Sequence, residues 1–427
     1  MRMKLNKSSQ LVLVSAASLL AAGLVTACGT LTVDFVFVAS SRAAGLNNFG
    51  EIDVFEVNSE SGRMRQIPTS PFPSGGRDPV AEAVTTDHQD LFVANYDDNT
   101  VAQFVIGNDG KIYPYNTVNT PGVYPIALAV NGLNLFVVDT YQPLPTCSTA
   151  SPCSGSIGVF PITAATSNLP DAIQPLSLPN GSQYYWPLCL TGYAQTSGTW
   201  NCKSTETHVL VPTAVTVLAS GTQVYIAAYD STAAPETGYV FGFTVGAGGA
   251  LTPVTNGPPT VAGIQPSGIA SGSTSNGNYV YVTDFIAGKV LGFSAGSSGT
   301  LTALPGSPYP AGNQPSAIVV DPSSAYPYAY VTNSQDATVE AYSISSSNGA
   351  LSFAGGSSTP VLYSTGLQPV AVGIDPSLNH YLYTINFLGN NVSGFQLSAT
   401  NGTLLDSQFS PYPSNANPTA VAAIPHQ

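Results

Sequence analysis

The sequence reads QPSAIVVDP at residues 314–322, AYVTN at 329–333, TVEAYSI at 338–344 and SNGALSF at 347–353. These four runs are rich in β-branched and aromatic residues, and each is separated from the next by a polar stretch containing Asn, Asp, Ser or Pro. Short runs bounded by turn residues are typical of β-strands joined into an antiparallel meander. Such a sheet has two apolar faces and cannot bury both by itself. The pattern therefore predicts that similar sheets pack on either side of it.

The same unit recurs along the chain. The proline that opens the first strand returns at intervals of 46 to 54 residues, except for one interval of 87 that holds an insertion. These prolines are Pro79, Pro125, Pro212, Pro266, Pro315, Pro369 and Pro418. A four-stranded unit with this period is the sequence signature of a β-propeller. Runs of the second-strand type, such as YVYVTD at 279–284, occur seven times, so the sequence predicts an all-β, seven-bladed β-propeller of four-stranded antiparallel blades.

The two ends of the repeat predict how the ring closes. The chain enters at a second-type strand, FVFV at 35–38, with no first-type strand before it. It finishes on NPTAVAAI at 417–424, a first-type strand with no second strand after it. We expect this C-terminal strand to join the first blade, because a closed ring leaves no unpaired edge. Residues 35–427 are then one propeller domain.

Composition excludes one class of function. Only 8% of the residues are charged, the net charge is −13, and the ten Lys and Arg residues are scattered along the chain. Attraction to a phosphate backbone requires clustered basic side chains. The sequence therefore predicts that this protein does not bind nucleic acid.

The N-terminal segment has the pattern of an export signal. Three basic residues within residues 2–7 precede an apolar run at 11–24, and VTAC follows at 25–28. Such a run is too short to span a bilayer and is typical of a signal peptide. Small residues before a cysteine resemble the lipobox of bacterial lipoproteins. We expect a lipoprotein signal peptide at 1–27, lipid attachment at Cys28 and a short tether at 28–34.

The resemblance to lipoproteins also implies a location. Gly29, not Asp, follows the cysteine, which in Gram-negative lipoproteins favours the outer membrane. The expected location is the cell envelope, outer-membrane or facing the periplasm, with the membrane as a partner through the lipid. The alternative is a plain secretory signal in which Cys28 has no role.

Four cysteines follow Cys28, namely Cys147, Cys153, Cys189 and Cys202. An even number in an exported chain indicates two disulfides, although four cysteines allow three pairings. We favour Cys147–Cys153 and Cys189–Cys202, because each pair closes a loop within one insertion. Metal binding is the alternative, but no CxxC spacing supports it, so no metal site is assigned.

Strand direction places both insertions on one face of the ring. The loops before the first strand and between the second and third strands open on the same side, which we call the top face. Insertions at about 141–156 and 179–210 both fall there. The second insertion holds the only tryptophans of the chain, Trp186 and Trp200. These aromatic side chains either form a contact surface for a ligand or make a small core beneath a long loop.

Polar residues recur where second strands end on the top face: Asn95, Asp139, Asp230, Asp284, Asn333 and Asn386. Asn and Asp in such positions commonly hydrogen-bond their own turns. The alternative is an oxygen-lined channel mouth that binds Ca²⁺ or sugar hydroxyls. No local calcium-loop motif is present, and no cofactor is assigned.

The repeat resembles a known family. YVTN at 330–333, YVTD at 281–284 and QPSAIVVDP at 314–322 are similar to the repeats of YVTN-repeat propellers. The nearest group looks like the lactonase-type family, which includes propeller 6-phosphogluconolactonases and the fungal carboxymuconate cyclase. The resemblance covers roughly residues 35–427 and implies a seven-bladed ring. It implies lactonase chemistry only weakly, because the shared residues belong to strands and turns.

The chain lacks the basic residues that an anionic lactone requires. A carboxylate or phosphate substrate needs a basic clamp, yet no arginine follows Arg77. Arg77, with Asp78 or Glu82, and His208 are the only catalytic candidates, and a surface ion pair is the simpler interpretation of Arg77. Hydrolase motifs such as GxSxG and HExxH are absent. No catalytic residue is assigned from the resemblance.

Three functions remain open at this point. The first is a binding module whose top face contacts a protein or a glycan. The second is a lactonase-type hydrolase or cycloisomerase acting on a weakly charged lactone. The third is a scaffold that only presents loops.

Overall fold

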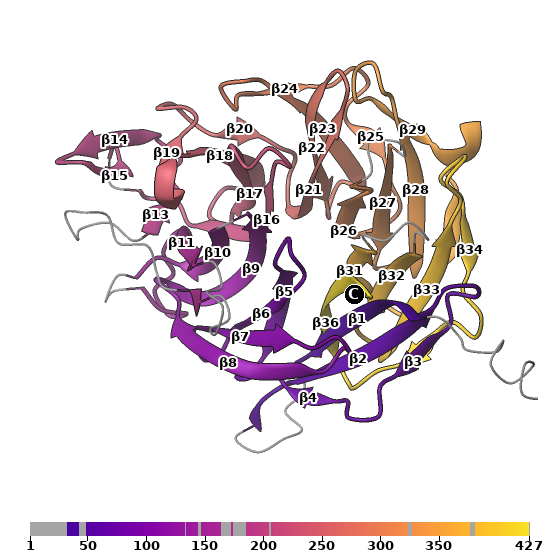
Figure 1. Cartoon of the computed structure of the whole chain (residues 1–427). Helices are drawn as coiled ribbons and strands as arrows, with labels where there is room; N and C mark the ends of the chain where they lie inside the picture. The colour runs from indigo at the N-terminus through magenta and orange to yellow at the C-terminus, as the bar shows by residue number, and fades with distance from the viewer. Residues whose placement is uncertain are drawn as a thin grey trace, which may run out of the picture.

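The computed structural model describes residues 32–41, 48–132, 134–143, 147–163, 172–173, 185–204, 206–322, 327–375 and 381–426. Seven antiparallel sheets stand around one central axis, and each is one blade (Figure 1). The predicted seven-bladed all-β propeller is confirmed. The expected signal peptide, Cys28 and most of the tether lie outside the described residues. No helix among the described residues is long and apolar enough to cross a bilayer.

Each blade begins at the axis with an innermost strand that pairs with a second strand. The innermost strands, in blade order, are β36 (Pro418–Pro425), β5 (Pro79–Val84), β9 (Val123–Asn131), β16 (Leu210–Val217), β21 (Pro266–Thr274), β26 (Pro315–Val320) and β31 (Pro369–Ile374). The second strands are β1 (Thr32–Ser40), β6 (Asp90–Asn95), β10 (Asn134–Tyr141), β17 (Gln223–Asp230), β22 (Gly277–Asp284), β27 (Tyr328–Asn333) and β32 (Tyr381–Asn386).

The third strands are β2 (Glu51–Asn58), β7 (Thr100–Ile106), β11 (Ser156–Thr163), β18 (Thr237–Val245), β23 (Lys289–Ala295), β28 (Thr338–Ile344) and β33 (Asn391–Leu397). The outermost strands are β3 (Met64–Gln66) with β4 (Phe72–Pro73), β8 (Ile112–Asn119), β12 (Ala172–Ile173) with β13 (Tyr185–Pro187), β19 (Leu251–Pro253) with β20 (Thr260–Val261), β24 (Leu301–Ala303) with β25 (Tyr309–Pro310), β29 (Leu351–Phe353) with β30 (Leu362–Ser364), and β34 (Leu404–Asp406) with β35 (Tyr412–Pro413). Two short 3₁₀ turns, η2 (Ala247–Gly249) and η3 (Ala354–Gly356), flank outer strands.

The outermost strand differs from the expected single strand. In six blades it is two short pieces that both pair with the third strand; β28, for example, pairs with β29 and β30. Only β8 is continuous, with a register shift at Gln103/Phe104. Because a sheet twists progressively away from the axis, its outermost strand must bend, and an interruption or a bulge allows that bend.

The C-terminal strand closes the ring. β36 pairs antiparallel with β1, with Val421 opposite Val38 and Ile424 opposite Phe35. Figure 1 shows the yellow end of the chain beside its indigo beginning. Asp53 on β2 adds to the seam, because its carboxylate accepts hydrogen bonds from the backbone and side chain of Asn415 at 2.6 and 3.2 Å. The predicted closure is confirmed.

Repeated contacts between a tyrosine and a turn join neighbouring blades. Tyr281 on β22 donates from its hydroxyl to the carbonyl of Gly349 in the next blade at 2.7 Å. Tyr225 and Tyr330 make the same bond to the blades that follow them, at 2.8 and 3.1 Å. Apolar side chains also pack between neighbouring blades. Tyr281 and Val290 of blade 5 share one cluster with three residues of blade 6, namely Ile318, Val331 and Tyr342. The core of the protein therefore lies between blades rather than within them.

The seven innermost strands line a central cavity of about 260 Å³. Hydroxyl groups link these strands around the axis: Ser267 donates to the carbonyl of Pro315 at 2.5 Å, and Thr419 donates to that of Pro79 at 2.7 Å. Glu82 is the only ionisable residue among those that line the cavity. Most side chains that line the channel are apolar, with hydroxyls and one carboxyl group, but polar atoms make up the larger part of its exposed surface.

Candidate ligand-binding face over blades 2 to 4

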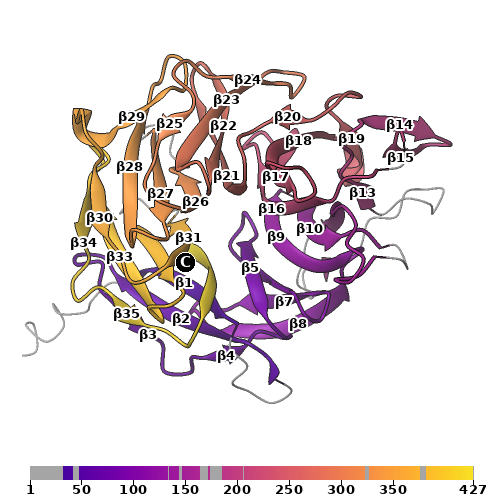
Figure 2. The ribbon, with the colours of Figure 1, turned by 180° about the vertical axis from the view of Figure 1, so that it is seen from behind.

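The described parts of the two insertions lie side by side, and hydrogen bonds connect them. The backbone N–H of Leu188 donates to the carbonyl of Gly155 at 2.9 Å, and Gly155 N–H donates to Leu210 at 2.9 Å. The described part of the second insertion begins only at Leu188, because Tyr185–Pro187 is the outermost strand β13 of blade 3. Its hairpin, β14 (Tyr193–Thr196) with β15 (Thr199–Cys202), projects from the rim in both views and does not reach the axis (Figures 1 and 2).

The two favoured disulfides are confirmed. Cys147 bonds Cys153 within the first insertion, and Cys189 bonds Cys202 at the base of the β14–β15 hairpin. Cys189, Cys202 and Glu206 also form the one close group of three potential metal ligands among the described residues. Since both sulfurs belong to the disulfide, neither is available as a thiolate ligand.

The six polar residues at the ends of second strands are buried, at 0 to 1% exposure. Asp139 accepts from Gly122 N–H at 2.8 Å, and burial raises its pKa to about 7. Asp284 accepts from the N–H groups of Ile264 and Gln265 at 2.8 and 3.2 Å. The amide groups of Asn95, Asn333 and Asn386 bond side chains of their own blades.

These six side chains therefore stabilise top loops and do not form an oxygen-lined mouth in this structure. The physical reason is that an aspartate at the end of a buried strand accepts from the amides of an adjoining turn, whereas the three asparagines bond side chains at the start of the next strand. A Ca²⁺ site on this face stays an untested prediction.

The tryptophans belong to a core. Trp186 is fully buried, and Trp200 packs against the same cluster of blade 3 and blade 4 side chains. Tyr193 lies in this cluster, with its hydroxyl donating to the carbonyl of Pro187 at 3.0 Å. Of the two interpretations of these aromatics, the small core is the one that the structure supports. Trp186 is not accessible to a ligand in this conformation.

Arg77 forms a surface ion pair. Its guanidinium lies 2.6 Å from Asp98 Oδ1, and its backbone N–H donates to Oδ2 of the same carboxylate at 2.7 Å. Glu82 does not join this pair, because it lies below in the central cavity. The expected grouping of Arg77 with Glu82 is therefore wrong; Glu82 is on β5, inside the ring.

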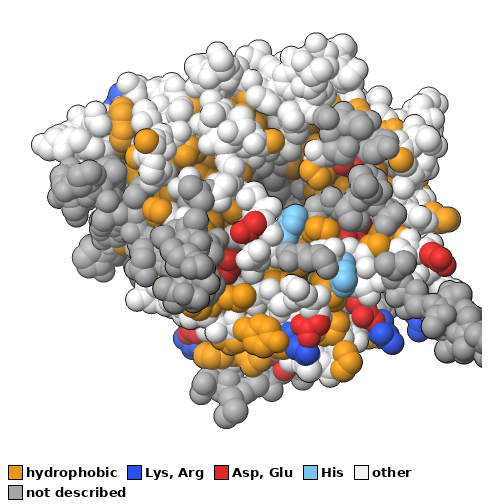
Figure 3. Space-filling model, in the orientation of Figure 1, with side chains coloured by type: hydrophobic (Ala, Val, Ile, Leu, Met, Phe, Trp, Pro, Cys, Tyr) orange, Lys and Arg blue, Asp and Glu red, His pale blue; other side chains and the backbone are white. Residues whose placement is uncertain are grey.

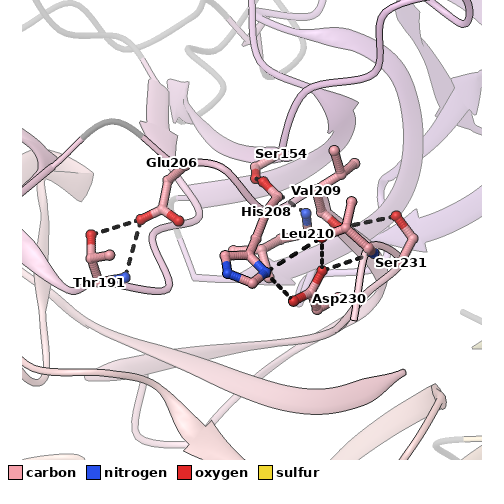
Figure 4. A network of polar contacts seen from close by, with 9 residues as sticks. Ser154, Thr191, Glu206, His208, Val209, Leu210, Asp230 and Ser231 are labelled. Atoms are coloured by element: carbon pink, nitrogen blue, oxygen red, sulfur yellow. Dashed lines mark hydrogen bonds and ion pairs between the residues drawn. The ribbon is translucent and has the colours of Figure 1, made fainter. Parts of the chain in front are cut away.

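His208 and Asp230 form a dyad on blade 4. His208 Nδ1 lies 2.5 Å from Asp230 Oδ2 (Figure 4). The histidine ring is 42% exposed, whereas the aspartate is 1% exposed. Burial tends to raise the pKa of Asp230, but hydrogen bonds from Thr232 and His208 outweigh it and lower the pKa below its ordinary value. Ser154 from the first insertion anchors the segment by donating to the carbonyl of His208 at 3.1 Å.

A cluster of three tyrosines stands on the top of blades 2 and 3. Tyr96, Tyr124 and Tyr141, which we call the tyrosine corner, are all partly exposed. The rings of Tyr96 and Tyr124 stack with centroids 4.7 Å apart, and Tyr141 meets Tyr124 edge-on at 5.9 Å. Sequence analysis missed this cluster, because its members come from three separate segments. The feature that could have revealed them is their position. Each tyrosine stands at the top end of a strand, Tyr96 in blade 2 and the other two in blade 3.

Hydrogen bonds connect the segments that carry the tyrosine corner and the His208 dyad. Thr140 donates to the carbonyl of Tyr124 at 2.8 Å, and Gln142 N–H donates to Ser154 at 3.1 Å. Ser154 in turn bonds His208. The surface of these segments over blades 2 to 4 is the candidate ligand-binding face.

A cavity larger than the central one lies beside the turn between β2 and β3 in blade 1, but its lining residues do not suggest a particular reaction or ligand. This cavity, of about 370 Å³, is lined by Thr32, Asn58, Arg63 and neighbouring residues. Its charged lining residue Arg65 is paired with Glu56 at 2.5 Å. Figure 3 shows Lys and Arg only sparsely on the face it displays.

Solved structures share this architecture. A proposed 6-phosphogluconolactonase of Bacteroides fragilis aligns with a TM-score of 0.61 at 19% identity, over 92% of this chain and 99% of that one. The periplasmic gluconolactonase PpgL of Pseudomonas aeruginosa aligns with a TM-score of 0.61 at 16% identity, with the same coverage. The fold is that of the lactonase-type propellers. At these identities the likeness to lactonase-type propellers establishes architecture only.

Comparison by sequence identifies no family for the chain. No protein-family model matches the chain, and no curated protein matches it.

A proposed 6-phosphogluconolactonase of Bacteroides uniformis is a further lactonase-type propeller, with a TM-score of 0.63 at 17% identity over 92% of this chain and 99% of that one.

Proposed function

We propose that this lactonase-type propeller is an exported binding module, lipid-anchored at Cys28, whose ligand contacts the top face over blades 2 to 4. The two disulfides favour an oxidising compartment outside the cytoplasm. The periplasmic gluconolactonase of similar fold supports the same location.

The tyrosine corner is the observation that carries the proposal. Tyrosine rings bury a large contact area at little entropic cost, and these three stand beside a loop that the Cys147–Cys153 disulfide constrains. Arg77 is already paired with Asp98, so among the described residues it offers no free guanidinium to an anionic ligand there. The face therefore suits a neutral or cationic ligand.

We expect Tyr124→Ala to weaken ligand binding about tenfold or more, as loss of a central aromatic contact commonly does. The measurement is equilibrium binding of the purified protein to an array of cell-wall and capsular oligosaccharides and small organic ions. Tyr113→Ala is the matched control, because Tyr113 is a 53% exposed tyrosine on an outer strand of blade 2. Equal binding by the wild type and Tyr124→Ala would count against the proposal.

The His208–Asp230 dyad favours hydrolysis of a weakly charged lactone as a second candidate function. Asp230 would hold the proton on Nδ1, leaving Nε2 to take a proton from the water that attacks the lactone carbonyl. His208→Gln is then expected to lower the hydrolysis rate of glucono-1,5-lactone by about 10²-fold or more. His426→Gln, an exposed histidine at the C-terminal end of the ring, is the control. A rate unchanged by His208→Gln would remove the dyad from consideration.

A further inference from the structure

We propose that the tyrosine corner binds an organic cation, either a quaternary ammonium group or a protonated amine. The inference rests on the proposed function and narrows its ligand class. It follows from the ring geometry, from the two acidic residues that neighbour Tyr96 through the backbone and from the pairing of Arg77.

The three rings form an electron-rich corner. Tyr96 and Tyr124 lie nearly parallel, at an interplanar angle of 17°, and Tyr141 stands at 72° to Tyr124. Ring faces carry partial negative charge and attract cations within about 6 Å of the centroid. Aromatic cages hold quaternary ammonium groups in proteins, and here Tyr124 and Tyr141 supply two walls, with Tyr96 stacked on Tyr124.

Two acidic residues, Asp78 and Asp97, neighbour Tyr96 through the backbone. Tyr96 N–H donates to the carbonyl of Asp78 at 2.9 Å, and Asp97 is the next residue along the chain. Burial raises the pKa of the Tyr96 hydroxyl, and repulsion from the other two tyrosine hydroxyls, Asp78 and Asp97 raises it further. Burial and the negative charge of Asp97 likewise raise the pKa of Asp78. Asp78 and Asp97 thus place negative charge near Tyr96, and a bound cation would offset it.

Arg77, which precedes Asp78 in the chain, does not supply a free positive charge to this corner. Arg77 donates from Nε and its backbone to Asp98, at 2.6 and 2.7 Å, and its terminal nitrogen bonds the carbonyl of Asp97 at 3.3 Å. Asp98 therefore neutralises Arg77. Asp97 makes no salt bridge among the described residues. The net charge of −13 further favours a positive ligand.

The corner is held in place before a ligand arrives. Tyr124 N–H donates to Asn99 Oδ1 at 2.6 Å, and Thr140 donates to the carbonyl of Tyr124 at 2.8 Å. Tyr141 ends β10, directly before the loop that contains the Cys147–Cys153 disulfide. Because these rings are already ordered, binding costs little conformational entropy.

Titration calorimetry at low salt tests the inference with two probes of equal shape. Choline carries the quaternary charge, and 3,3-dimethylbutan-1-ol replaces its nitrogen with carbon. We expect choline to bind at least about tenfold more tightly than the alcohol. Tyr124→Ala should abolish the heat of choline binding, Asp97→Asn should weaken binding several-fold, and Tyr113→Ala should leave it unchanged.

The outcomes separate this inference from the proposed function. Equal affinity for choline and the alcohol, or no heat with choline, overturns the cation site. If a neutral oligosaccharide then binds the wild type but not Tyr124→Ala, the binding module stands and only the ligand class is wrong. Because Tyr124 also packs on its neighbours, Asp97→Asn provides the second test: Asp97 is exposed, so its replacement leaves the fold intact while removing the charge. Choline affinity unchanged by Asp97→Asn would contradict the proposed role of the carboxylates.

Discussion

Gly349→Ala is expected to lower the free energy of unfolding by roughly 2–4 kcal/mol, from positive-φ strain together with overpacking. Gly349 has φ of +74°, and a Cβ atom there would lie 2.3 Å from a ring carbon of Tyr279 in the preceding blade. The same residue accepts the Tyr281 hydroxyl. The substitution therefore strains one turn and separates two blades. Urea denaturation followed by circular dichroism measures the effect.

Gly248→Ala is the matched control for this prediction. Gly248 also has a positive φ, +68°, but no atom lies within 4 Å of the position of its Cβ. Only the backbone cost should remain, about 1 kcal/mol. If the two variants lose the same stability, the contact between the turn glycine and the tyrosine of the preceding blade contributes nothing to the ring.

Glu82→Gln is expected to raise the melting temperature at neutral and alkaline pH, by roughly 2–5 °C. Both carboxyl oxygens of Glu82 are buried and make no hydrogen bond of ordinary geometry, although the backbone of Ala39 and Ala422 lies close by. Burial raises the pKa of this carboxyl well above its ordinary value, and the negative charge of Asp53 adds to the shift. Glutamine keeps the shape of the side chain and removes its ionisation.

The pH dependence has a definite sign. Because the folded state holds the Glu82 proton more tightly than the unfolded state, the group favours folding most below its unfolded pKa of about 4.3. That contribution is lost as pH rises towards the folded pKa. Asp53, with its pKa raised to about 6 mainly by burial, acts in the same direction. The melting temperatures of wild type and Glu82→Gln should therefore agree near pH 4 and diverge above it.

Glu60→Gln supplies the control, because Glu60 is an exposed glutamate in a turn of blade 1. Its melting curve should follow that of the wild type at every pH. A constant difference between Glu82→Gln and the wild type from pH 4 to pH 9 would mean that ionisation of Glu82 does not affect stability.

The periodic residues alone predicted the architecture. A proline before each innermost strand and a β-branched or aromatic second strand mark every blade, and the unpaired final strand indicated closure onto β1. Both disulfides followed from cysteine spacing within single insertions. These features depend on strand pairing and short loops, which local sequence specifies.

Only the tertiary structure decided what those residues do between blades. Gly349 is needed for a tyrosine of the neighbouring blade as well as for its own turn, and that contact joins residues far apart in sequence. The ends of the second strands are buried, which no periodicity reveals. The tyrosine corner is assembled from three separate segments; Tyr96 has aromatic counterparts in two other blades, Phe285 and Phe387, whereas Tyr124 and Tyr141 have none. Repetition determines how a ring closes, whereas a site on its rim depends on where non-repeating side chains meet after closure.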